Sequence, residues 1–239
     1  MDLSFGGFIT NQLQAVLWFE GYEPTAKDVV RLTAGKWGAI LDGEPVLLPN
    51  TAGLPPELPR AIVPSADGHW KLQISARRLE LGWDQLLDQG VSAPANFATV
   101  VQSSFAPFFE VDEKLRVTRI AYVIRRHLAV EQPAKTLATY FVRNELRSHN
   151  GPLNRPEGFE LHAHKKYRPN KLPEINSWIR WRTAKLTNAD IPVIAVSQDL
   201  NTPEGRDLLF TSGEVESFFD NALPEADSIL NVYLSLPPK

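Results

Sequence analysis

The sequence contains no cysteine among its 239 residues. The chain therefore has no disulfide, no thiol nucleophile and no thiolate metal ligand, which favours a reducing compartment such as the cytoplasm. Long apolar runs are also missing, because the run Ala15 to Phe19 is far shorter than the roughly 20 residues of a membrane-spanning helix. Met1 to Phe5 lacks the basic segment and apolar core of a signal peptide. We expect a cytoplasmic protein with no membrane segment.

Sequence motifs of the common catalytic classes are missing too. The chain has no His-Glu-x-x-His segment, no P-loop and no Gly-x-Ser-x-Gly segment. No cofactor is predicted, and the sequence leans towards a protein without catalytic activity.

Basic residues are concentrated in one internal segment. Arg116 to Lys185 holds fifteen Lys/Arg and five Asp/Glu, a net charge of +10. The two flanks together hold ten basic and twenty-three acidic residues, so the formal net charge of −3 conceals a strong asymmetry. Such an asymmetry indicates an acidic partner, either nucleic acid or an acidic protein.

Apolar periodicity and turn residues predict strands and helices in the first half of the chain. The apolar stripe of the second helix consists of every third or fourth residue after its cap, Asn96. The expected elements are a buried strand (Leu13 to Glu20), a short helix (Pro24 to Gly35), two short strands around the Asp42-Gly43 turn (Ala39 to Leu48), a loop (Asn50 to Pro59), one strand (His69 to Trp83) and a helix (from Asn96).

The second half is predicted to follow a similar order. Thr211 and Glu214 form a capping-box pattern that opens the last helix, and Pro224 is expected to break or kink it. The other expected elements are a long strand (Val117 to Val130), a helix that starts at Pro133, two strands joined by a short turn (Phe159 to Arg168 and Ile175 to Leu186) and a further strand (Ile191 to Asp199).

Two local echoes support an internal duplication. The segment Trp70 to Arg77 resembles Trp178 to Lys185 at an offset of 108 residues, and Phe108-Phe109-Glu110 resembles Phe218-Phe219-Asp220 at an offset of 110. The short connections between the later strands favour antiparallel pairing. We therefore predict an α+β protein with two similar strand–helix–strands–helix halves, residues 1–114 and 115–239. Each half is expected to be a mainly antiparallel sheet backed by helices, and the two halves are expected to pack as one unit.

The two predicted strands of the basic segment place cations on one face. Pairing Phe159 to Arg168 with Ile175 to Leu186 gathers basic side chains beside Trp178, a combination that suits phosphates and stacked bases. The same charges could instead be solvated or pair with the acidic flanks. The predicted site for nucleic acid or an acidic partner consists of Lys165, Lys166, Arg168, Lys171, Trp178, Arg180, Arg182 and Lys185.

A metal site is a weaker alternative on the same strand. Glu160, His162 and His164 alternate along one face and are ligand types for Fe(II), Mn(II) or Zn(II). Successive positions of one strand converge poorly on an ion, and the neighbouring lysines repel a dication. Surface histidines on a polar strand are the simpler interpretation.

Short motifs resemble a known group of proteins. The order of elements and two short motifs resemble a sporadically distributed prokaryotic family of similar length with no assigned activity. The motifs are Arg119-Ile120-Ala121 at mid-chain and Ser75-Ala-Arg-Arg-Leu79 before the first long helix. This chain has Ile124-Arg125-Arg126 where that family has an aromatic-Ile-Asn ending. The resemblance implies a fold and a mobile-element distribution, and it implies no reaction. The topology also resembles duplicated modules that bind small molecules between their copies.

Three functions remain open from the sequence. The leading hypothesis is a non-catalytic binding protein whose basic strand face contacts nucleic acid or an acidic protein. The second is a small-molecule- or metal-dependent site between the two halves. The third is a structural role in a homo-oligomer, in which the acidic half of one copy contacts the basic half of another.

Overall fold

The computed structural model describes residues 3–21, 25, 40–48, 55–86, 90–111, 115–186, 190–205 and 208–235. These residues form η1 (Phe5–Gly7), β1 (Ile9–Glu20), β2 (Val46–Leu47), β3 (Pro59–Pro64), β4 (Trp70–Ser75), β5 (Arg78–Asp84), α2 (Phe97–Val111), β6 (Arg116–Ala129), α3 (Pro133–Phe141), α4 (Asn144–Arg147), β7 (Glu160–Tyr167), β8 (Ile175–Leu186), β9 (Ile191–Asn201) and α5 (Ser212–Leu234).

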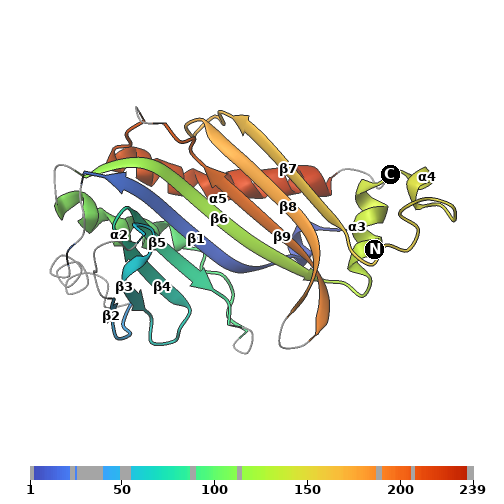
Figure 1. The fold of residues 1–239 in the computed structure, drawn as a ribbon, viewed down its shortest axis with the longest axis horizontal. Coiled ribbons are helices and arrows are strands. Elements are labelled where there is room, and N and C mark those ends of the chain that lie inside the picture. Colours follow the sequence, from blue (N-terminus) through green and yellow to red (C-terminus); the bar gives the residue numbers. More distant parts are fainter. Residues whose placement is uncertain are drawn as a thin grey trace.

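The described strands form one antiparallel sheet in the order β2-β3-β4-β5-β1-β6-β9-β8-β7. All strands of the first half lie on one side and all strands of the second half on the other (Figure 1). β1 and β6 pair along most of their length and form the seam between the halves. The α+β class and the antiparallel pairing are thus confirmed.

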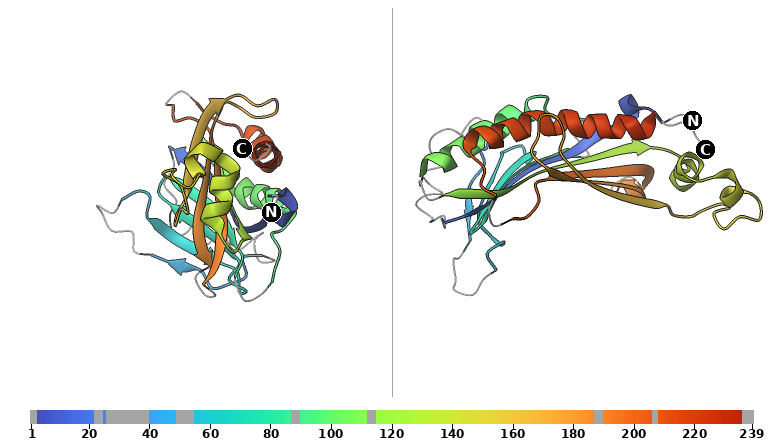
Figure 2. Two further views of the ribbon diagram at one scale, coloured as in Figure 1. Left: turned by 90° about the vertical axis from the view of Figure 1, so that its right-hand side faces the viewer. Right: turned by 90° about the horizontal axis from the view of Figure 1, so that it is seen from above.

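Two long helices, α2 and α5, lie against one face of the sheet (Figure 2, right). α3 packs against β8 and β9 at one end of the sheet. The opposite face, which Figure 1 views, is covered by none of the described helices, and we call it the open face. No helix in the described ranges is long and apolar enough to cross a membrane.

Alternation along each strand explains why one face is covered. In β1 the side chains of Leu13, Leu17 and Phe19 are buried towards the helices, whereas Gln12 and Gln14 on either side of Leu13 are less buried. Removing a large apolar side chain from water contributes about 2 kcal/mol, so this pattern fixes which face the helices cover.

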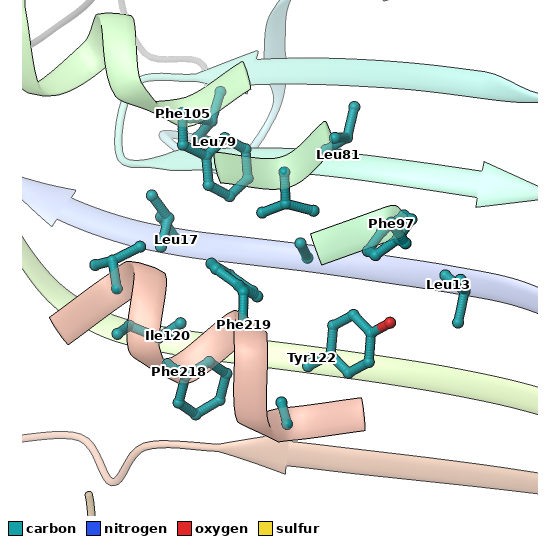
Figure 3. Packing of buried hydrophobic residues seen from close by; sticks show 14 of the residues in the cluster. Leu13, Leu17, Leu79, Leu81, Phe97, Phe105, Ile120, Tyr122, Phe218 and Phe219 are labelled. Carbon is teal, nitrogen blue, oxygen red and sulfur yellow. The ribbon is translucent and has the colours of Figure 1, made fainter. Parts of the chain in front are cut away.

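Aromatic rings join the helices to the sheet at the seam (Figure 3). Phe219 of α5 packs edge-on against Phe105 of α2 at a ring-centroid distance of 5.8 Å and against Tyr122 of β6 at 6.3 Å. Phe97 at the start of α2 contacts the same Tyr122 ring at 5.6 Å. One hydrophobic core therefore spans both halves.

Most predicted elements are present, with three corrections. The strand predicted from His69 to Trp83 is a hairpin of β4 and β5, because the chain reverses at the Ala76–Arg77 bend. β3 was not predicted, since its proline ends resemble a loop. α5 opens with the predicted capping box but continues through Pro224 rather than ending there.

Three predicted features fall wholly or partly outside the described residues. These are the helix from Pro24 to Gly35, the division near residue 114 and most of the loop from Asn50 to Pro59. Of the two short strands predicted from Ala39 to Leu48, the described residues contain only β2.

The halves share a topology, but one of the two sequence echoes does not match it. Counted outward from the seam, the order is β1-β5-β4-β3 in one half and β6-β9-β8-β7 in the other. Trp70 stacks on Phe97 in the core, whereas Trp178 lies on the open face, so the offset of 108 residues aligns opposite faces. The internal duplication stays a prediction.

Candidate nucleic-acid interface

The four strands of the second half place their open-face side chains in regular rows. Antiparallel register aligns Arg125 of β6, Ser197 of β9 and Arg180 of β8 in one row. The next row contains His127 and Ala195 followed by Arg182. We call the open-face side chains of β6 to β9 the basic face; its charged and aromatic members are Arg116, Arg119, Arg125, His127, Glu160, His162, His164, Lys166, Trp178, Arg180, Arg182 and Asp199.

The charge asymmetry of the sequence persists on the open face. On the basic face, six Arg or Lys side chains face two carboxylates, those of Glu160 and Asp199. On the strands of the other half, Lys71 and Arg78 lie on the same side of the sheet as Glu20, Glu80 and Asp84, so that side carries no net positive charge. An anion approaching the open face is therefore attracted to one half of it.

The structure brings together half of the predicted site. Lys166, Trp178, Arg180 and Arg182 share the open face through the predicted pairing of β7 with β8. Lys165 lies on the opposite face, where its ammonium nitrogen is 4.3 Å from the centroid of the Tyr167 ring. The remaining predicted residues lie at the ends of these strands: Arg168 and Lys171 are exposed in the β7–β8 connection, and Lys185 is near the end of β8.

Several predicted cations are paired within the fold. Arg180 bonds to Glu160 at 2.5 Å, Lys166 to Glu174 at 3.0 Å, and Lys185 to Asp190 at 2.8 Å. The hydrogen bond from Arg180 lowers the pKa of Glu160 below its usual range. These pairs are solvent-exposed and contribute little to stability, so an incoming anion can compete for the cations.

Three exposed arginines of the basic face, Arg116, Arg125 and Arg182, are not paired in this way within the described residues. Arg125 and Arg182 are exposed, and neither forms an ion pair with any residue in the described part of the chain. One strand, β9, separates them, which corresponds to about 10 Å across the sheet. Arg125 was not predicted as a site residue. Its position next to the buried Ile124 in a strand nevertheless indicates that the Arg125 side chain points to the opposite, open face.

Trp178 forms an aromatic platform with two histidines. Its side chain is 37% exposed. The His164 ring stacks on the indole at a centroid distance of 3.7 Å, and the His162 ring is 5.1 Å away. This arrangement uses both histidines of the predicted metal site for ring packing.

The predicted metal site itself is not formed. The carboxylate of Glu160 is engaged by Arg180, while His162 and His164 flank Trp178. Across the described residues no group of three or more His, Asp or Glu side chains is placed to hold a metal ion. The side chains of the three predicted ligands are therefore engaged by Arg180 and Trp178 rather than by one another.

Asp199 carries negative charge in the middle of the basic face, in register with Trp178. Burial raises the pKa of this carboxyl, and a 2.9 Å hydrogen bond from Asn201 Nδ2 together with the charge of Arg119 opposes the rise. Arg119 in turn lies over the Trp18 ring of β1, with 4.7 Å between the guanidinium carbon and the ring centroid. When ionised, the carboxylate of Asp199 therefore repels an anion at the centre of this face.

A pocket of about 430 Å³ opens on the basic face beside the seam. Its floor is formed by Ala195 and Ser197, because these small side chains lie between arginine-bearing strands on either side. We call it the seam pocket; its lining includes Asn11, Asp84 and Gln85 of the first half and Arg125, His127, Arg180, Arg182 and Lys185 of the second.

Comparisons with known proteins add little to this geometry. No family model matches the chain, and a search of curated proteins found no match either. Among solved structures, the chain is similar to one described as Methanococcus jannaschii TBP, with 8% identity and a TM-score of 0.27 over 96% of this chain and 99% of that one. A TM-score this low carries no argument about fold or function.

Proposed function

We propose that this protein binds nucleic acid on the basic face and has no catalytic role there. The observation that carries the proposal is the presence of two exposed arginines without an ion pair among the described residues, Arg125 and Arg182, on the same open sheet face as the exposed ring of Trp178. Guanidinium groups bind phosphates through paired hydrogen bonds, and an aromatic ring adds stacking to bases. An acidic protein would use the cations but has less use for the aromatic platform.

The proposal is tested by measuring binding to single-stranded and duplex oligonucleotides across a salt series. Trp178→Ala is expected to weaken single-strand binding by about 1 to 3 kcal/mol, the usual contribution of one stacked base. Arg182→Gln is expected to weaken binding to all sequences and to reduce the dependence of log affinity on log salt by about one.

Lys71→Gln provides the matched control, because Lys71 is an exposed cation on the open face of the other half. This variant is expected to bind as the unmodified protein does. If neither strand form binds at low salt, or if Arg182→Gln and Lys71→Gln lose affinity equally, the proposal fails. Retained binding of an acidic polypeptide in that case favours a protein partner.

Other sequence-based predictions stand beside this proposal without further support. They include the cytoplasmic location, the resemblance to the sporadic prokaryotic family and the homo-oligomer. The oligomer would be detected as a mass that falls with added salt.

A further inference from the structure

The seam pocket has the composition of a site for one anionic group. Arg125 projects from one wall and Arg182 from the other, with the small side chains of Ala195 and Ser197 between them. Its volume of about 430 Å³ is within the range of small-molecule sites and exceeds what a single oxyanion needs.

The charges that line the seam pocket favour an anion. Asp84 is its one acidic lining residue, and the Oδ1 atom of Asp84 accepts a 2.7 Å hydrogen bond from Gln12 Nε2. Arg180 and Lys185 are each held by one exposed carboxylate, whereas Arg125 and Arg182 have no such partner in the described part of the chain. The pocket therefore retains net positive charge.

His127 is a buried polar group of the pocket with an unused ring nitrogen. The residue is 7% exposed, and its Nδ1 atom makes no hydrogen bond to any residue that the structure describes. Asn11 lines the same pocket, and its buried Oδ1 atom is likewise without a hydrogen-bond partner among the described residues. Buried polar atoms of this kind normally have a partner. The His127 ring can donate from Nδ1 to an oxyanion, whereas Asn11 Oδ1 accepts only and gains nothing from an anion.

We propose that the seam pocket binds one phosphate-type oxyanion group, held between Arg125 and Arg182, with His127 donating a hydrogen bond to it from Nδ1. The inference deepens the proposed function, because the terminal phosphate of a nucleic-acid strand is one source of such a group. A free nucleotide is the other source, and it would bind between the two halves of the chain.

Binding at this site is coupled to protonation. Burial lowers the pKa of His127 and keeps the ring neutral in the free protein. An oxyanion next to the ring favours the imidazolium, so binding takes up a proton and affinity rises as the pH falls. β9 and β1 add no charged side chain to the pocket lining. The charged groups that line it from the other elements are Asp84 of β5, Arg125 and Arg126 of β6, and Arg180, Arg182 and Lys185 of β8. Arg126 is paired with Asp227 at the covered face.

Sulfate is the first probe, because it remains a dianion across the range in which histidine titrates. Calorimetry is expected to show tighter sulfate binding at about pH 5.5 than at about pH 8. Arg125→Gln and Arg182→Gln are expected to weaken binding about tenfold at both values. Lys71→Gln, on the open face of the other half and outside the pocket lining, is the control and is expected to leave sulfate binding unchanged.

His127→Gln is expected to remove the pH dependence while leaving affinity at high pH nearly unchanged. Because His127 is buried, thermal unfolding of this variant must first show a folded protein. The exposed Arg182→Gln variant tests the site even if His127→Gln does not fold. Absence of sulfate binding, or equal pH dependence in folded His127→Gln, overturns the inference.

The source of the anionic group is identified with two further ligands. Tighter binding of a 5′-phosphorylated oligonucleotide than of its unphosphorylated form, lost in Arg125→Gln, supports a terminal phosphate. Displacement of sulfate by a nucleoside monophosphate alone supports a free nucleotide, and failure of both ligands to displace sulfate overturns the inference. If oligonucleotides bind but neither the 5′-phosphate nor the pocket variants change the affinity, the seam-pocket inference fails and the proposed function stands. If a nucleotide binds but oligonucleotides do not, the proposed function fails and the seam-pocket inference stands.

Discussion

The guanidinium of Arg126 in β6 donates a hydrogen bond to the carboxylate of Asp227 in α5 at the covered face of the sheet. Arg126 is 3% exposed, and it also donates to Gln198, whose Nε2 atom donates a 2.7 Å hydrogen bond to the carbonyl oxygen of Ala226. One cation of the basic segment is therefore used inside the fold, paired with an acid of the C-terminal flank. The Arg126–Asp227 pair stabilises the packing of α5 against β6 at the seam.

Asp227→Ala is expected to destabilise the protein by about 3 kcal/mol, because it leaves the buried Arg126 charge unpaired. Urea unfolding measures the change. Glu204→Ala is the control, since Glu204 is 81% exposed where it pairs with Arg119, and its removal is expected to cost less than about 1 kcal/mol. Equal losses in the two variants would show that burial does not set the energy of the Arg126 pair.

Asp199→Asn is expected to raise the free energy of unfolding at neutral pH. Burial raises the pKa of Asp199 in the folded state above its value in the unfolded chain. The folded state therefore binds more protons than the unfolded state between the two pKa values. Stability consequently falls as the pH rises from about 4 through the folded-state pKa. Asparagine avoids that loss. The gain is expected at neutral pH and should disappear below about pH 4, as measured by unfolding at several pH values.

The same substitution makes a second check possible on the basic face. Removing the negative charge in register with Trp178 is expected to tighten oligonucleotide binding at neutral pH. A variant that is more stable but binds no better would place the nucleic acid away from Asp199.

Pro224→Ala is expected to stabilise the protein by about 2 kcal/mol. Proline inside a helix lacks one backbone donor and clashes with the preceding turn, a cost of about 3 kcal/mol, part of which the stiffer unfolded chain offsets. Pro224 lies within α5 and is exposed, so alanine removes no core contact. Pro133→Ala is the control, because proline in the first turn of α3 sacrifices no helical hydrogen bond and its loss should bring no gain.

Local patterns predicted the elements in which one face is strongly apolar. The alternation of β7 and β8 was read correctly because period two is a direct consequence of strand geometry, and the capping box at Thr211 depends on residues three positions apart. The β4–β5 hairpin was missed because its reversal at Ala76–Arg77 lacks the glycine, asparagine or aspartate that usually indicates a tight turn. The helix does not end at Pro224, because packing of the long helix outweighs one lost hydrogen bond.

By itself, the sequence determined the α+β class, the faces of the basic strands and the concentration of charge in one half, since each depends on residues close in the chain. Only the tertiary structure decided which charges remain available. Arg126 and Arg180 are paired, Lys165 lies on the other face, and Arg125 joins Arg182 across β9. That outcome depends on strand order and register, which bring together residues far apart in the chain and which no local pattern encodes.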